Sequence, residues 1–91
     1  MSRLLELYPS VEALLETLFR GNEIELLYKG EGYFLLPKFD SSGKQVIGVI
    51  VGNARENCVI QTKEELCLAP IGGSPFGDII SALEVTWYNF L

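Results

Sequence analysis

The sequence contains no histidine, the side chain that most enzymes use for proton transfer near neutral pH. Without it there can be no Ser-His or Cys-His nucleophile pair, and most zinc sites are excluded as well. Neither a phosphate-cradling loop nor a calcium-binding spacing is present. The sequence therefore predicts a protein that is not an enzyme, with no catalytic residues, no metal and no cofactor.

Cysteine is scarce, because Cys58 and Cys67 are the only two in the chain. Each lies among apolar residues, where a free thiol behaves as a small hydrophobic side chain. Nothing in the sequence requires a disulfide between them, although one could join them. Two buried thiols are typical of a reducing compartment, so we expect a cytoplasmic protein.

Clustered positive charge and long apolar runs are also missing. Seven Lys and Arg residues stand singly against twelve Asp and Glu, for a net charge of −5, which predicts no nucleic-acid partner. The longest apolar run, Val46–Val51, is far shorter than the roughly 20 residues of a membrane-spanning helix. Glu6 and Pro9 interrupt the apolar residues near the N-terminus, unlike a signal peptide. We expect no membrane contact.

Apolar side chains, in contrast, exceed what so small a chain can bury. Hydrophobic residues make up 48% of the 91 residues, and a single domain of this length, residues 1–91, buries only about 60 to 65% of its unfolded surface. The remainder must lie outside, where contiguous apolar area usually marks an interface. We expect a homodimer or another protein partner, and no small-molecule ligand, because a pocket would consume much of the core.

A capped helix is predicted after residues 1–8, which we expect to form a turn or an extended arm. Ser10 suits the N-cap, while Arg20 and Gly21 suit the end of the helix. The apolar residues between them recur at helical spacing and comprise Val11, Leu14, Leu15, Leu18 and Phe19.

A β-hairpin is predicted next, with a first strand at residues 23–28 and a glycine-containing turn at residues 29–32. Leu26 can pair with either Tyr33 or Leu35 in this hairpin, and both registers keep the same residues on the core face. Pro37 has no N–H to donate, so we expect the second strand to end there, at an edge or exit.

A turn at residues 40–44 leads to a predicted central strand at Val46–Val51, which should be covered on both faces. Gly48 and Gly52 share one side of this strand, which suggests close approach of another backbone or a bulge. A loop then returns the chain to a short strand at Cys58–Gln61.

Two further helices are predicted in the last third of the chain. Thr62 and Glu65 form a capping box for a short helix that Pro70 ends, and Gly72–Gly73 then provides a flexible joint. Ser74–Pro75 is suited to start a longer helix, whose apolar seam comprises Phe76, Ile80, Leu83, Trp87 and Phe90. A strand through residues 85–88 is the alternative.

These elements predict an α+β fold with an N-terminal helix and a mainly antiparallel four-stranded sheet, and with the short and the longer C-terminal helix packed on one sheet face. Aromatic side chains gather at the hairpin and at the chain end, and they anchor interfaces as well as fill cores. The candidate interface residues are Trp87, Tyr88, Phe90, Leu91, Tyr28 and Tyr33.

The element order and the hairpin resemble a group of small uncharacterised bacterial and phage-borne α+β proteins. The resemblance is carried by GNEIELLYKGEGYFLL, by TKEELC and by the SPFGDII segment, over residues 10–87. It brings no catalytic residues and implies a non-enzymatic accessory protein, with immunity or anti-defence factors as one option.

Two functions are therefore expected from the sequence. The first is a protein-interaction module that associates with itself through its aromatic C-terminus or an open sheet edge. The alternative is a small acidic inhibitor, of the immunity or anti-defence kind, that binds a basic partner protein. Its candidate acidic surface comprises Glu12, Glu16, Glu23 and Glu25.

Overall fold

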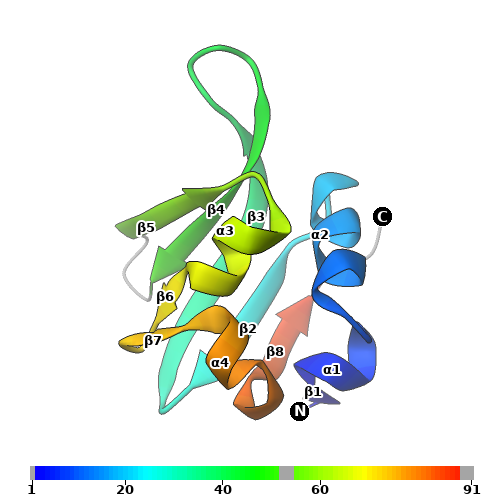
Figure 1. Cartoon of the computed structure of the whole chain (residues 1–91), viewed down its shortest axis with the longest axis vertical. Helices are drawn as coiled ribbons and strands as arrows, with labels where there is room; N and C mark the ends of the chain where they lie inside the picture. The colour runs from blue at the N-terminus through cyan, green and yellow to red at the C-terminus, as the bar shows by residue number, and fades with distance from the viewer. Residues whose placement is uncertain (1, 52–54, 89–91) are drawn as a thin grey trace.

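A six-stranded antiparallel sheet forms one layer of the molecule, and short helices form the other (Figure 1). The computed structural model describes residues 2–51 and 55–88. The strands lie in the order β1-β8-β2-β3-β4-β5, with the bounds β1 Ser2–Arg3, β2 Ile24–Tyr28, β3 Glu31–Phe39, β4 Gln45–Val51, β5 Arg55–Ile60 and β8 Glu84–Tyr88. The predicted α+β class is confirmed, but the sheet has six strands rather than four.

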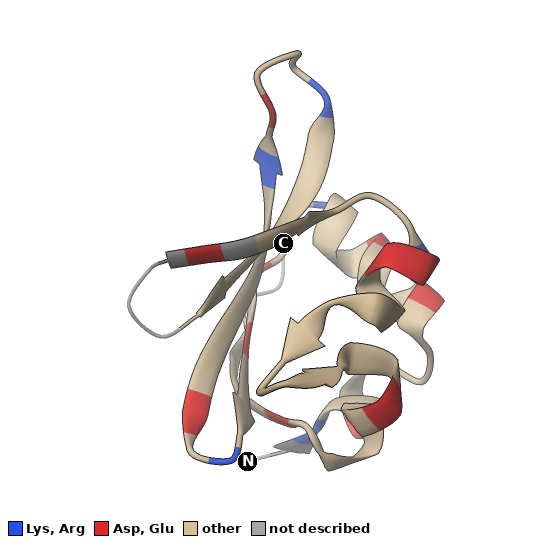
Figure 2. Cartoon of the chain, turned by 60° about the vertical axis from the view of Figure 1, so that its left-hand side comes forward, with Lys and Arg blue, Asp and Glu red and all other residues tan. Residues whose placement is uncertain are grey.

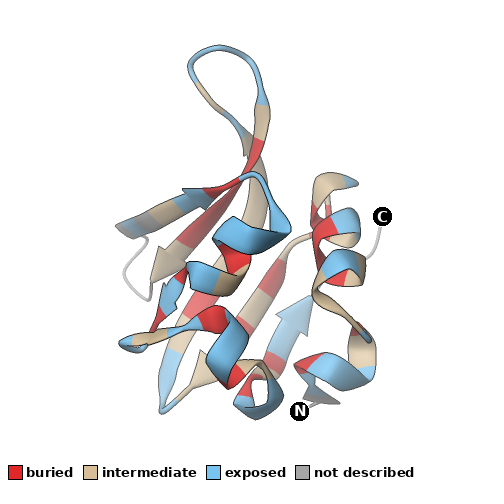
Figure 3. Ribbon diagram, viewed as in Figure 1, coloured by how far each residue is buried: buried red, intermediate tan, exposed pale blue. Residues whose placement is uncertain are grey.

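The helices all lie on one face of this sheet, as predicted (Figure 2). They are α1 Leu4–Leu7, α2 Val11–Phe19, α3 Lys63–Leu68, α4 Phe76–Ile79 and the 3-10 turn η1 Ile80–Ala82. A two-stranded ribbon of β6 Pro70–Ile71 and β7 Ser74–Pro75 lies with them. Buried residues occur in the helices and in the sheet (Figure 3), and together they form one hydrophobic core.

The predicted first helix is confirmed as α2. The Ser10 hydroxyl accepts a hydrogen bond from the Ala13 N–H at 3.1 Å and so caps the helix. Leu14, Leu15 and Leu18 are buried against the sheet. The N-terminal segment, predicted as a turn or an extended arm, forms β1 and the single turn of α1, and the Leu4 N–H donates to the Leu83 carbonyl at 3.0 Å.

The hairpin adopts one of the two predicted registers, with Leu26 opposite Tyr33. Its turn consists of Lys29 and Gly30, whose φ values of 51° and 80° give the primed geometry that matches strand twist. The expected strand end at Pro37 is wrong, because β3 continues to Phe39 and Pro37 lies opposite Ile47. Pairing with β2 reaches only Leu35, so Pro37 lies past that pairing, where a missing N–H is tolerated.

β3 and β4 extend past the rest of the sheet as a hairpin arm (Figure 1). The turn predicted at residues 40–44 forms its tip. The Asp40 carboxylate accepts hydrogen bonds from the Ser42 N–H at 2.9 Å and from the Lys44 N–H at 3.0 Å, as well as one from the Ser42 hydroxyl. These bonds, the Ser42 hydroxyl foremost, lower the pKa of Asp40.

β4 is central, as predicted, because it pairs with both β3 and β5, but the expected cover on both faces does not extend along the strand, since Ile50 is half-buried and outside the core under the helices. The space above Gly48 is occupied by side chains rather than by another backbone, since a Cβ there would lie 3.1 Å from Lys38 Cδ and 3.2 Å from Glu56 Oε1. Gly48 pairs regularly with Val59, so the bulge expected there is not found at Gly48, and the register shift of this pairing lies between Val49 and Ile50. Gly52 lies outside the described residues.

The capping box of α3 is confirmed, since Thr62 Oγ1 accepts from the Glu65 N–H at 3.1 Å and Glu65 Oε1 accepts from the Thr62 N–H at 3.0 Å. Gly72 and Gly73 are not a flexible joint. They form the two-residue turn between β6 and β7, with φ values of 58° and 85°.

The longer C-terminal helix predicted from Pro75 to Phe90 is wrong. Helical structure ends at Ala82 after α4 and η1, and the chain then forms β8, the alternative considered for residues 85–88. β8 fills the position between β1 and β2, and its aromatic and β-branched residues suit a strand. Phe76 and Leu83 of the expected seam are buried, but Trp87 is exposed, and Phe90 lies outside the described residues.

Candidate interaction surface

One face of the sheet carries apolar side chains that no described helix covers. Along β3, Tyr33 and Leu35 are buried under the helices, so Phe34 and Leu36 point to the opposite face. Ile50 lies opposite Phe34 on β4, and Leu27 shares this side of β2. We call this surface the open face, and its apolar members are Leu27, Phe34, Leu36, Ile50, Val59 and Trp87.

Strand register arranges the centre of the open face as a row that runs across five strands. The row consists of Trp87, Glu25, Phe34, Ile50 and Glu56, in the order β8-β2-β3-β4-β5. Trp87 is 46% exposed and Val59 40% exposed, while Phe34 and Ile50 are half-buried without belonging to the core under the helices. The row is therefore apolar in the middle and partly acidic toward its ends.

The two carboxylates of the central row, Glu25 and Glu56, have partners within the chain. Lys38 of β3 forms an ion pair with Glu56 of β5, and this pair bridges β4 above Gly48. Glu25 accepts a hydrogen bond from the Thr86 hydroxyl at 2.7 Å. An approaching protein therefore meets one ion pair, Lys38–Glu56, and one negative charge, that of Glu25, around an apolar centre.

The predicted aromatic interface residues are separated by the fold. Trp87 lies on the open face, whereas Tyr88 pairs opposite core-facing Ile24 and is 39% exposed. Tyr28 is half-buried, with the Lys29 ammonium 5.3 Å from its ring centre. Tyr33 is a core residue, 2% exposed, and its hydroxyl donates to Glu31 at 2.8 Å.

Phe90 and Leu91, the last two candidate interface residues, lie outside the described residues. Trp87 is thus the candidate that the structure brings to the open face.

The pKa of the Tyr33 hydroxyl is raised mainly by burial, and the hydrogen bond to Glu31 raises it further, as expected for a phenol held in the core.

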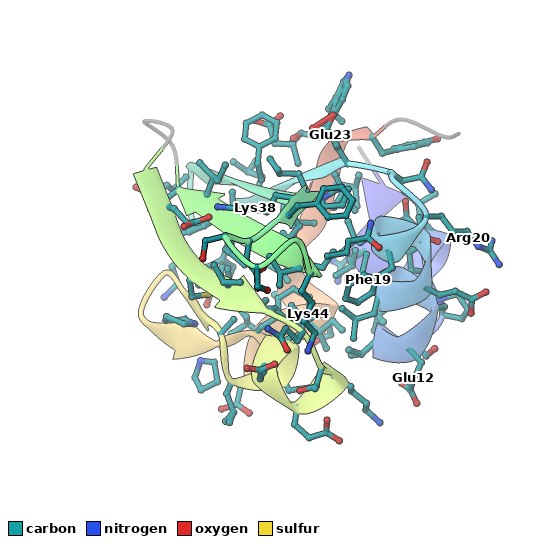
Figure 4. The ribbon with its side chains drawn as sticks, turned by 90° about the horizontal axis from the view of Figure 1, so that it is seen from above. Glu12, Phe19, Arg20, Glu23, Lys38 and Lys44 are labelled. Carbon is teal, nitrogen blue, oxygen red and sulfur yellow. The ribbon has the colours of Figure 1, made fainter. Side chains whose placement is uncertain are left out.

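The candidate acidic residues do not gather into one surface. On α2, Glu12 pairs with Lys63 at 3.2 Å and Glu16 pairs with Arg20. Glu23 lies in the segment before β2, well away from Glu12 (Figure 4), and Glu25 is on the open face. The field of the net charge is therefore spread over the molecule rather than focused on one side.

The sheet edges are less suited to pairing than the open face. β5 is the last strand of the described sheet, but its pairing with β4 contains a bulge and it carries the Glu56 ion pair. Short strands, bulges and charges are the features that blunt edges against association. On the other side, β1 pairs only with the first part of β8.

The described side chains offer little reactive chemistry. Within this part of the chain, no group of three or more His, Cys, Asp or Glu residues is placed to hold a metal ion. Cys58 and Cys67 are free and half-buried, and burial, then Glu56 and Glu65, raises the pKa of the Cys58 thiol. Across residues 2–51 and 55–88, no helix is long and apolar enough to cross a membrane.

Two features of the sequence indicate the open face. Leu27 interrupts the polar side of the first strand, and residues 46–51 are apolar on both sides. The predicted helices were sufficient to cover one face only, so the second apolar face required a partner or exposure.

Comparison of the chain with family models, curated proteins and solved structures finds no match.

Proposed function

We propose that this chain is a non-enzymatic protein-interaction module that forms a homodimer through the open face. The observation that carries the proposal is the apolar surface around Phe34, Ile50 and Trp87, on the side of the sheet opposite the helices. Sheets pack face to face in just this way, with interdigitated apolar side chains. The tryptophan supplies the kind of large exposed side chain that commonly anchors interfaces.

The charge arrangement favours a second copy over a strongly basic partner. A basic partner would need unpaired carboxylates gathered on one side, and Glu12 and Glu16 are instead paired with cations on α2. On the open face, Glu56 is paired with Lys38 and Glu25 is hydrogen-bonded to Thr86. A partner of the same composition buries the apolar centre and leaves these pairs at its rim.

The size of the open face sets the expected affinity. With strands about 4.8 Å apart and residues about 3.3 Å apart, the face across β8 to β5 measures roughly 20 Å by 17 Å. Its flat footprint of roughly 350 Å² is smaller than the about 800 Å² per partner of a standard interface. We therefore expect a reversible dimer with a dissociation constant in the micromolar range.

Light scattering on a size-exclusion column over a broad concentration series tests the proposal. The mass should rise from the 10.1 kDa of one chain toward twice that value. Phe34→Lys should remain a monomer, because it places a charge in the apolar centre. Since the added lysine makes the net charge of −5 less negative, the loss cannot come from added repulsion between copies.

Leu68→Lys is the matched control, because Leu68 is 73% exposed on α3 in the helical layer. It makes the same chemical change away from the open face and should dimerise like the native chain. A native chain that stays monomeric at every concentration would contradict the proposal. Added salt should tighten a homodimer of acidic chains by screening their repulsion, whereas it would weaken a complex with a basic protein.

A further inference from the structure

We propose that the two copies pack about a two-fold axis parallel to the strands, between β2 and β3, so that Trp87 of each chain contacts Ile50 of the other. This inference rests on the proposed homodimer. It adds the orientation of the copies, and it assigns to Ile50 the role of receiving the tryptophan.

A symmetric face-to-face pair of sheets has two simple arrangements, because its two-fold axis can run across the strands or along them. The central row of Trp87, Glu25, Phe34, Ile50 and Glu56 distinguishes them. Each arrangement places different members of this row in contact.

An axis across the strands, centred on this row, lays every strand on its own copy. Glu25, which is hydrogen-bonded to a hydroxyl rather than paired with a cation, then faces Glu25 in an interface that excludes water, and each Lys38–Glu56 pair faces its own copy. Like charges in contact are strongly unfavourable where the dielectric is low, and each chain already carries a net charge of −5. This arrangement is disfavoured by the residues of the row itself.

An axis along the strands, between β2 and β3, exchanges the neighbours instead. Given the order β8-β2-β3-β4, β2 of one chain lies over β3 of the other, and β8 lies over β4. Glu25 then meets Phe34, and Trp87 meets Ile50, so no carboxylate of the row faces its own copy. Apolar contact is kept and like-charge contact is removed.

The surroundings of Ile50 suit a large ring. Two residues earlier on β4, on the same face, Gly48 has no side chain and the aliphatic stem of Lys38 lies above it. A lysine stem provides apolar contact, and its ammonium group is attracted to the face of an indole. Trp87 is 46% exposed in one chain and would gain contact on both sides of its ring.

Disulfide trapping tests the orientation. In a chain with Cys58 and Cys67 changed to alanine, Trp87→Cys and Ile50→Cys are combined and oxidised. Within one chain these positions are three strands apart, roughly 14 Å, beyond the about 7 Å limit for a disulfide. A covalent dimer should therefore form between chains, at a rate at least tenfold above that of the Trp87→Cys variant alone.

Each outcome separates the inference from the proposed function. If the Trp87→Cys variant alone cross-links as fast as the double variant, the axis runs across the strands and the inference is overturned, while the homodimer remains. If the native chain is monomeric in light scattering, both are overturned. If the double variant does not cross-link although the native chain dimerises, the inference is overturned.

A test without cysteines protects against a variant that fails to fold. Glu25→Gln keeps a group that can hydrogen-bond to Thr86 but removes the charge. Removing the charge relieves the burial of Glu25 in either orientation, so the test is the mixture of native and Glu25→Gln chains. Under the proposed orientation each Glu25 faces Phe34 and acts independently, so mixed dimers should form at the statistical ratio. An excess of mixed dimers of tenfold or more would show that Glu25 faces its own copy, which contradicts the inference.

Discussion

Gly72→Ala should destabilise the fold more than the neighbouring change Gly73→Ala, and the difference isolates one contact. Both glycines occupy the β6–β7 turn with positive φ, at 58° and 85°. A Cβ on Gly72 would lie 2.7 Å from Cδ2 of Tyr28, closer than real Cβ contacts, whereas a Cβ on Gly73 meets nothing within 4 Å. Gly72 therefore fits the turn against the β2–β3 hairpin.

The two substitutions share one energetic term and differ in another. Holding alanine at positive φ costs roughly 1 to 2 kcal/mol at either position. Forcing the half-buried Tyr28 ring aside adds roughly 1 to 3 kcal/mol at Gly72 alone. Urea unfolding should therefore show a larger loss for Gly72→Ala. In a domain of this size each kcal/mol corresponds to about 4 to 8 °C in melting temperature.

Equal losses of unfolding free energy for the two variants would refute this reasoning, because they would show that the contact with Tyr28 adds no measurable cost. A double-mutant cycle with Tyr28→Ala provides the second check. Removing the ring should remove the excess cost of Gly72→Ala and leave the cost of Gly73→Ala unchanged. If the excess persists without the ring, its cause lies elsewhere in the turn.

Three smaller perturbations test other parts of the structure. Thr62→Ala should cost about 1 kcal/mol by removing the cap of α3, as measured by urea unfolding, and Thr62→Ser should restore most of it. Gly48→Ala should displace the Lys38 side chain and weaken its ion pair with Glu56. The free energy of unfolding should change by less than about 1 kcal/mol, since exposed ion pairs contribute little. A larger loss in thermal unfolding would mean that the backbone cannot adjust. The pKa of Asp40 is lower in the folded chain than in the unfolded chain. The hydrogen bonds that its carboxylate accepts from Ser42 and Lys44 therefore stabilise the turn fully above the unfolded pKa of about 3.9. This stabilisation is lost as the pH falls through the folded pKa. Amide shifts of Ser42 in an NMR titration should report a midpoint below 3.9, absent in Asp40→Asn; a midpoint at or above 3.9 would contradict this.

Local sequence signals predicted the structure well wherever neighbouring residues decide it. The Ser10 cap, the Thr62–Glu65 capping box and the hairpin at Lys29–Gly30 all depend on hydrogen bonds or φ angles within a few residues. Such features form in nearly any tertiary context. The element order from α2 to α3 therefore followed from the sequence, with boundary errors of a few residues.

The C-terminal segment could not be assigned from local pattern, because its residues fit both a helix and a strand. Phe76 and Leu83 recur at helical spacing, while residues 85–88 have the composition of a strand. The position between β1 and β2 decides between them, since β8 pairs on both sides there. That position depends on residues more than 60 apart in sequence, such as Thr86 and Glu25, which are hydrogen-bonded.

The candidate surface was predicted only in part for the same reason. An excess of apolar residues pointed to an interface, and Trp87 was among the residues named for it. The face on which Trp87 lies depends on the register of β8 against β2, including the shift between Glu25 and Leu26. No pattern within β8 contains that information.

Dimerisation and folding are linked if the open face is the interface, and this gives a prediction independent of chromatography. Self-association that involves only the folded chain stabilises each chain by about 0.7 kcal/mol for every tenfold increase in total concentration well above the dissociation constant, because the free folded chain increases as the square root of the total. The urea midpoint of the native chain should therefore rise with protein concentration, while that of Phe34→Lys should stay constant and that of Leu68→Lys should follow the native chain. A native midpoint that does not move across the micromolar range would mean that the sheet is stable with its apolar face in water. The open face would then have to be explained by some other partner.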